Sequence, residues 1–135
     1  MIQRKQTLFI LTSLILTVII IFFIDLVNSH QCNIQLYLSS DLSIKMFFYV
    51  SLILGLVSFF LFKNRLLQYR ICVFNMYFQI CPIIYTCSYI SNKNCMPQFS
   101  EMIGFYLLFL IFTFYGLSAI YIKKDDDLIK SVDRI

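Results

Sequence analysis

The apolar residues of the chain come in four long blocks that are separated by short polar segments. The blocks cover residues 7–27, 46–62, 71–90 and 102–122. Each has the roughly 17–25 residues that an α-helix needs to cross the hydrocarbon core of a bilayer, and none alternates apolar and polar positions as a barrel strand does. Because lipid offers no hydrogen-bond partners to the backbone, each block must be helical. The pattern therefore predicts four transmembrane helices.

The composition agrees with this pattern. Of the 135 residues, 60% are hydrophobic and only 13% are charged, whereas an ordinary soluble domain has about 25% charged residues. A soluble enzyme is therefore excluded.

The Lys and Arg residues are distributed unequally between the polar segments. Nine of the eleven lie at the N-terminus, in the turn at residues 63–70 or in the tail at residues 123–135, while the two other loops hold only Lys45 and Lys93. By the positive-inside rule both termini and this turn should be cytoplasmic. The positive charge is thus an orientation signal, and we expect no binding of nucleic acid. Short loops make sequential helices antiparallel neighbours. We predict one all-α domain over residues 1–135, an integral membrane four-helix up-down antiparallel bundle with cytoplasmic termini.

Polar side chains follow one face of the third predicted helix. Asn75, Gln79 and Thr86 recur at helical spacing, and they form an intramembrane polar stripe that should face the other helices. The second predicted helix offers a matching face of small residues, which are Ser51, Gly55 and Ser58. We interpret the stripe as hydrogen-bonding groups that fix helix packing. A path for a substrate or a proton, as in a small transporter, is the alternative.

The five cysteines include two, Cys32 and Cys95, in the loops predicted to face an oxidising compartment. A disulfide between them is possible, and the sequence leaves it open. A membrane thiol–quinone enzyme that uses Cys32, Cys87 and Cys95 is a second alternative, although the chain lacks the Cys-x-x-Cys pair of such enzymes. No catalytic set, metal-ligand set or cofactor motif is recognisable, so we expect a protein that is not an enzyme and needs no cofactor.

Three polar segments carry the most distinctive motifs. The chain opens with Met-Ile-Gln-Arg, has Asn-Arg and Gln-x-Arg before the third helix, and ends with Asp-x-Leu-x-x-Ser-x-Asp-Arg. In these motifs it resembles a small four-pass membrane family of Bacteroidota, domain of unknown function 4293. The resemblance implies an inner-membrane protein and assigns no activity. The cytoplasmic polar cluster that these motifs form comprises Arg4, Asn64, Arg65, Gln68, Arg70, Asp127, Asp133 and Arg134.

The leading functional hypothesis is a non-enzymatic membrane subunit or scaffold that binds through its cytoplasmic face. Its expected partners are the lipid bilayer and either another inner-membrane protein or a second copy of the chain. We expect a solvated tail that anchors the last span. Because Leu128, Val132 and Ile135 share a helical face, the alternative is a short helix that lies on the membrane surface or docks on a partner. We also expect Asp133, or a carboxylate among residues 125–127, to pair with Arg65 or Arg70.

Overall fold

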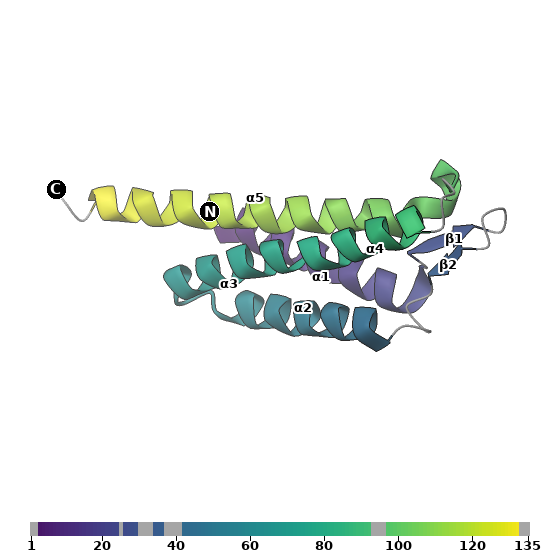
Figure 1. The fold of residues 1–135 in the computed structure, drawn as a ribbon. Helices are drawn as coiled ribbons and strands as arrows, with labels where there is room; N and C mark the ends of the chain where they lie inside the picture. Colours follow the sequence, from purple (N-terminus) through teal and green to yellow (C-terminus); the bar gives the residue numbers. More distant parts are fainter. Residues whose placement is uncertain (1–2, 25, 30–33, 37–41, 93–96, 133–135) are drawn as a thin grey trace.

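Helices make up most of the protein in the computed structural model, which describes residues 3–24, 26–29, 34–36, 42–92 and 97–132. The elements in chain order (Figure 1) are α1 (Gln3–Phe23), β1 (Val27–Ser29), β2 (Ile34–Leu36), α2 (Leu42–Phe60), α3 (Arg65–Phe78), α4 (Ile80–Asn92), the 3₁₀ helix η1 (Phe99–Met102) and α5 (Ile103–Val132). The predicted all-α class is confirmed, with one short antiparallel hairpin added to it.

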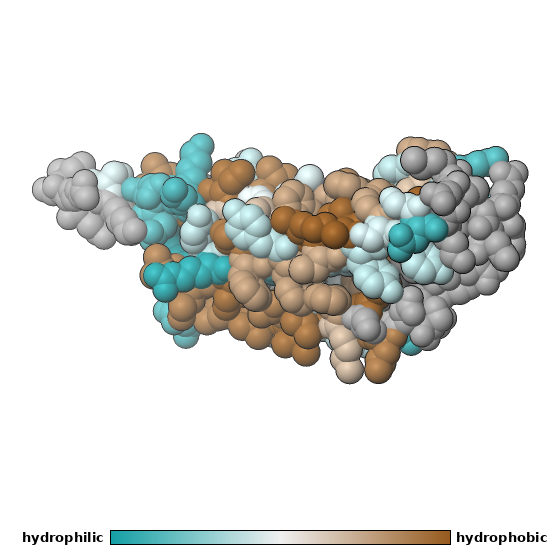
Figure 2. Space-filling model, viewed as in Figure 1, coloured by the Kyte–Doolittle hydropathy of each residue, from teal (hydrophilic) through white to brown (hydrophobic). Residues whose placement is uncertain are grey.

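The helices have the length and composition of membrane spans. Within the described residues, three stretches are long and apolar enough to cross a bilayer, Gln6–Phe23, Arg65–Asn92 and Phe99–Ile129, and α2 adds a shorter apolar run, Ile44–Phe60. Large apolar side chains such as Leu8, Ile53 and Ile120 are more than half exposed on these helices. Figure 2 shows this apolar surface over the middle of the face drawn, with hydrophilic residues toward the ends. Such an extensive exposed apolar surface is typical of lipid contact.

The helices lie side by side, and each of α1 and α3 packs against both α2 and α5 (Figure 1). The interior is filled mainly from α1, α2 and α5, where Ile20, Phe48, Leu108 and Ile111 are almost completely buried. Two contacts fix which helix ends meet. The Gln6 side chain near the start of α1 donates a hydrogen bond to the Tyr121 carbonyl, three turns before the end of α5 (2.9 Å). At the start of α5, Phe105 N donates to the Leu26 carbonyl after α1 (3.2 Å).

The helix boundaries differ from the predicted spans because the apolar blocks do not mark where each helix ends. The block at residues 7–27 overruns α1, which ends at Phe23, and its last residue begins the strand β1. There Val27 pairs with Leu36 of β2, and both Leu26 and Val27 are buried. The other helices extend beyond their blocks into polar residues, most of all α5, which continues without a break to Val132. The tail is therefore helical as far as Val132, as a continuation of α5.

Helical structure is interrupted between α3 and α4 at Gln79, within the predicted span 71–90. Pro82 has no backbone N–H to donate to the carbonyl four residues earlier, which is that of Phe78, and its ring disfavours an unbroken helix there. The Thr86 hydroxyl does not bond to the Phe78 carbonyl. It donates instead to the carbonyl of Pro82, four residues earlier in α4 (2.8 Å). The proline at position 82 therefore accounts for the position of this break.

A close contact between α2 and α5 depends on a glycine. A β-carbon built on Gly55 would overlap the Tyr115 hydroxyl and would lie 2.6 Å from Leu14 Cδ2. Tyr115 is completely buried, so its ring has little room to move away. The absence of a side chain at Gly55 thus allows α2 to approach α1 and α5 together.

We expect the substitution Gly55→Ala to lower the free energy of unfolding by about 1–3 kcal/mol, because it overpacks this contact. Thermal unfolding of the purified protein in detergent measures the change. Gly116→Ala is the matched control, since the nearest atom to its added carbon is the flexible Met76 Sδ at 3.3 Å. Adding Tyr115→Phe removes the overlapping hydroxyl and should recover part of the loss. If Gly55→Ala costs the same with and without the Tyr115→Phe change, this explanation is contradicted.

Candidate binding site where α3 begins and α5 ends

An ion pair joins the start of α3 to the extended end of α5. Arg65 NH1 lies 3.0 Å from Asp125 Oδ2, and the two side chains are 25% and 11% exposed. This is one of the contacts predicted between the basic turn and the acidic tail. Asp125 is on the same face of α5 as Ile122, which is buried, so the carboxylate points toward the other helices rather than into water. Arg65 supplies the positive charge that this largely buried carboxylate requires.

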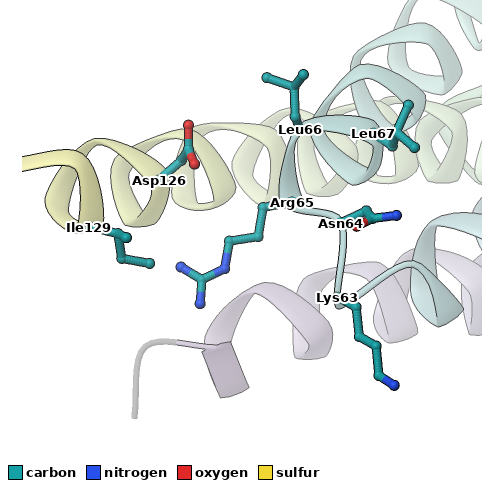
Figure 3. A pocket seen from close by; sticks show the side chains of 7 residues that line it. All are labelled: Lys63, Asn64, Arg65, Leu66, Leu67, Asp126 and Ile129. Carbon is teal, nitrogen blue, oxygen red and sulfur yellow. The ribbon is translucent and has the colours of Figure 1, made fainter. Parts of the chain in front are cut away.

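A cleft of about 660 Å³ opens beside this ion pair. Its lining residues come from the turn before α3, the first turn of α3 and the end of α5, and they are Lys63, Asn64, Arg65, Leu66, Leu67, Asp126 and Ile129. In Figure 3, Arg65 extends from the start of α3 toward α5, which contributes Asp126 and Ile129, while Lys63 points away from α5. We call this set the α3–α5 cleft. It combines exposed apolar side chains with both signs of charge.

The apolar members of the cleft lie beyond the apolar middle of the helices. Leu66, Leu67 and Ile129 are 52%, 45% and 40% exposed, although they share the cleft with the charged residues Lys63, Arg65 and Asp126. Exposed apolar groups with a charged rim are typical of a surface that binds another molecule.

The length of α5 creates one wall of this cleft. Its 30 residues extend about 45 Å at 1.5 Å per residue, whereas the hydrocarbon core of a bilayer is only about 30 Å thick. Figure 1 shows α5 continuing past the start of α3 and of α1. The last turns of α5, beyond the buried Asp125, therefore project from the packed helices as a helical arm, which we call the α5 arm.

The cytoplasmic polar cluster predicted from the sequence is only partly brought together. Gln68 is buried against the other helices, and Arg65 pairs with Asp125. Asn64 is exposed at the N-cap position of α3, where its side chain makes no capping hydrogen bond. Arg70 and Asp127 are exposed. Asp133 and Arg134 lie outside the described residues, as does the side chain of Arg4.

Ile129 is absent from the residues predicted for the site, Lys63 was used only for orientation, and Asp126 was included only among the carboxylates expected to pair with Arg65 or Arg70. A signal was present, because Ile122, Asp126 and Ile129 repeat at spacings of four and three and so continue one face of the fourth apolar block. That face lines the α3–α5 cleft and its neighbouring cavity. Leu128, which belongs to the face noted in the sequence instead, lines a different cavity on α5.

The intramembrane polar stripe is the second group of candidate residues, and all three of its members are buried. Asn75 Nδ2 donates to the Ser51 carbonyl (3.0 Å), and Gln79 Nε2 donates to the Ser51 hydroxyl (2.6 Å). Both hydrogen bonds join α3 and the following turn to α2. Thr86 bonds within its own helix instead. The stripe therefore connects two helices at one point, which agrees with a role in packing.

The described cysteines, Cys72, Cys81 and Cys87, are free thiols, the first buried and the others exposed. Cys32 and Cys95 lie outside the described residues, so the proposed disulfide stays a prediction. Within the described part of the chain, no three His, Cys, Asp or Glu side chains come together as metal ligands could.

A family model with the description "Domain of unknown function (DUF4293)" matches residues 2–135. The chain belongs to this family. The DUF4293 match covers both the basic turn before α3 and the α5 arm, so the α3–α5 cleft is built from residues inside the family's domain. No curated protein and no solved structure matches the chain.

We expect Arg65→Gln to destabilise the protein by about 1–3 kcal/mol, because Asp125 is then buried without its cation. Adding Asp125→Asn should recover part of that loss, since the second change removes the unpaired charge. Thermal unfolding in detergent at neutral pH measures both variants. Arg70→Gln, an exposed arginine on the next turn of α3, should change the free energy of unfolding by no more than about 0.5 kcal/mol. Strictly additive effects of the Arg65 and Asp125 changes would contradict a direct interaction.

Proposed function

We propose that this DUF4293 protein is a non-enzymatic subunit or scaffold of the bacterial inner membrane. In this model its helices cross the bilayer as a four-helix up-down bundle, and its termini and the turn before α3 are cytoplasmic. Another inner-membrane protein binds in the α3–α5 cleft. The observation that carries the proposal is the cleft itself, where exposed leucines and an isoleucine stand within a charged surface.

The placement of charge supports this orientation. Lys63, Arg65 and Lys123 lie at the end of the molecule where α3 begins and α5 ends, and Lys45 lies in the first turn of α2 at the other end. A positive-inside arrangement puts the cleft on the cytoplasmic side. The bilayer then covers the apolar middle of the helices, and the cleft opens beyond its surface.

The shape of the cleft supports a protein partner. Its 660 Å³ is open rather than enclosed, and it is bounded by a helical arm that protrudes beyond α3. An apolar segment of a partner can lie on Leu66, Leu67 and Ile129, while Lys63 and Asp126 at the rim select the partner's charges. Nucleic acid is disfavoured, because acidic residues interrupt the basic ones.

The proposed orientation predicts which positions an impermeant thiol reagent reaches. In variants that carry a single cysteine, Lys45→Cys should react with a membrane-impermeant maleimide in intact spheroplasts. Lys63→Cys and Lys124→Cys should react only after the membrane is opened, because their positions face the cytoplasm. The Lys45 variant is the control that shows the reagent is active. Labelling of position 63 in intact spheroplasts would refute the topology.

The proposed docking in the cleft predicts a specific cross-link. A photo-reactive amino acid at Leu67 should capture a defined membrane protein in living cells. Ile129→Asp should reduce that product about tenfold or more, since burying an unpaired carboxylate in the interface costs well over about 1.4 kcal/mol.

Leu128→Asp is the matched control, because Leu128 is similarly exposed on the same arm but does not line the cleft. It should leave the cross-linked product unchanged. Equal loss of the product in both variants, or recovery of the protein alone after gentle extraction and cross-linking, would count against the proposal.

A further inference from the structure

A second cavity, of about 200 Å³, lies between α3 and α5 on the membrane side of the α3–α5 cleft. Its lining residues are Arg65, Leu66, Tyr69, Ile122, Lys123, Asp126 and Asp127. It shares Arg65, Leu66 and Asp126 with the cleft, but it reaches one turn deeper along both helices, to Tyr69 on α3 and to Ile122 on α5. We call it the headgroup cavity.

The charges that line the headgroup cavity balance one another. Arg65 and Lys123 are cations, and the two aspartates at positions 126 and 127 are anions. Arg65 is engaged with Asp125, whereas Lys123 is exposed. A ligand with only negative charge would be attracted by Lys123 and repelled by the carboxylate of Asp127, which lines the same cavity. A ligand that carries one charge of each sign fits both groups.

The position of the cavity points to a lipid. Ile122 marks the last buried apolar turn of α5 before the charged arm, and Tyr69 lies opposite it on α3. Tyrosine is enriched at this level of membrane proteins, where its ring contacts acyl chains and its hydroxyl contacts headgroups. Ile120, on the membrane side of Lys123, is 63% exposed and offers apolar surface to an acyl chain.

We propose that the headgroup cavity binds the headgroup of phosphatidylethanolamine. The ammonium of Lys123 and the hydroxyl of Tyr69 donate hydrogen bonds to the lipid phosphate, and the carboxylate of Asp127 accepts a hydrogen bond from the lipid ammonium. A primary ammonium has N–H groups to donate, whereas the quaternary ammonium of phosphatidylcholine has none. The acyl chains lie along Leu66 and Ile120. The site therefore distinguishes an amine headgroup from both a choline and an anionic glycerol headgroup.

Native mass spectrometry of the purified full-length protein tests this assignment. The protein is titrated in detergent with phosphatidylethanolamine, phosphatidylcholine or phosphatidylglycerol that carry identical acyl chains. We expect phosphatidylethanolamine to be retained about two- to fivefold better than either competitor, which is the range for one partly exposed ion pair. This comparison needs no variant, so it stands even if a substitution prevents folding.

Two substitutions separate the proposed contacts. Asp127→Asn should abolish the preference for phosphatidylethanolamine, and Lys123→Gln should weaken phosphatidylethanolamine and phosphatidylglycerol alike. Lys124→Gln is the matched control, because Lys124 is the next residue on α5 and is also exposed but does not line the cavity. Its lipid preference should equal that of the unmodified protein.

Equal retention of the three lipids would overturn the proposal and would indicate a nonspecific lipid shell. A preference for phosphatidylglycerol would also overturn it, because the site would then respond to negative charge alone. The measurement uses the isolated protein and requires no protein partner. Its outcome is therefore independent of whether the α3–α5 cleft docks another membrane protein.

Discussion

A polar group between apolar helices has no water to bond, so it must find its partner within the protein. Asn75 and Gln79 meet this constraint by donating to the carbonyl and the hydroxyl of one residue, Ser51. Interhelical hydrogen bonds of this kind contribute about 0.6 kcal/mol on average in a membrane protein, so their main effect is to select one register between neighbouring helices. The position of α2 against α3 follows from this selection, and the contact of Gly55 with Tyr115 then fixes α2 against α5.

The same constraint applies to the smaller hydroxyls of the interior. Ser13, Ser58 and Ser118 each donate to a carbonyl three residues earlier in their own helix. Because these side chains are small, they also allow close helix approach. At the cytoplasmic end proposed here the situation is different, because water can reach the charged side chains. There the Arg65–Asp125 ion pair orients the α5 arm, and the apolar residues beside it remain accessible to a ligand.

Much of the fold could be predicted because lipid imposes a simple pattern on the sequence. The apolar blocks, the buried Asn75 and Gln79, and the pairing of the basic turn with the acidic tail all follow from charge and periodicity. The helix ends could not be predicted in the same way. Residues 24–27 are mostly apolar, yet hydrogen bonding to β2 and to the start of α5 takes Leu26 and Val27 out of the helix. The α5 arm was missed for the opposite reason, since a helix can continue into water once packing has formed it.

The α3–α5 cleft is formed by two helices that are far apart in the sequence, so neither helix alone predicts it. The motif residues of the basic turn identify the correct end of the molecule, but the α3–α5 cleft also requires Ile129, which has meaning only when α5 is known to remain helical to that point. The interior of the helices offers less to an external ligand, because Asn75 and Gln79 already use donor groups in contacts with Ser51. A transport path through the stripe would have to break those contacts in a medium with no water to replace them, at a cost for each unsatisfied group. The cleft can be occupied without disturbing the helix packing, and for this reason we place the binding function at the end of the helices rather than between them.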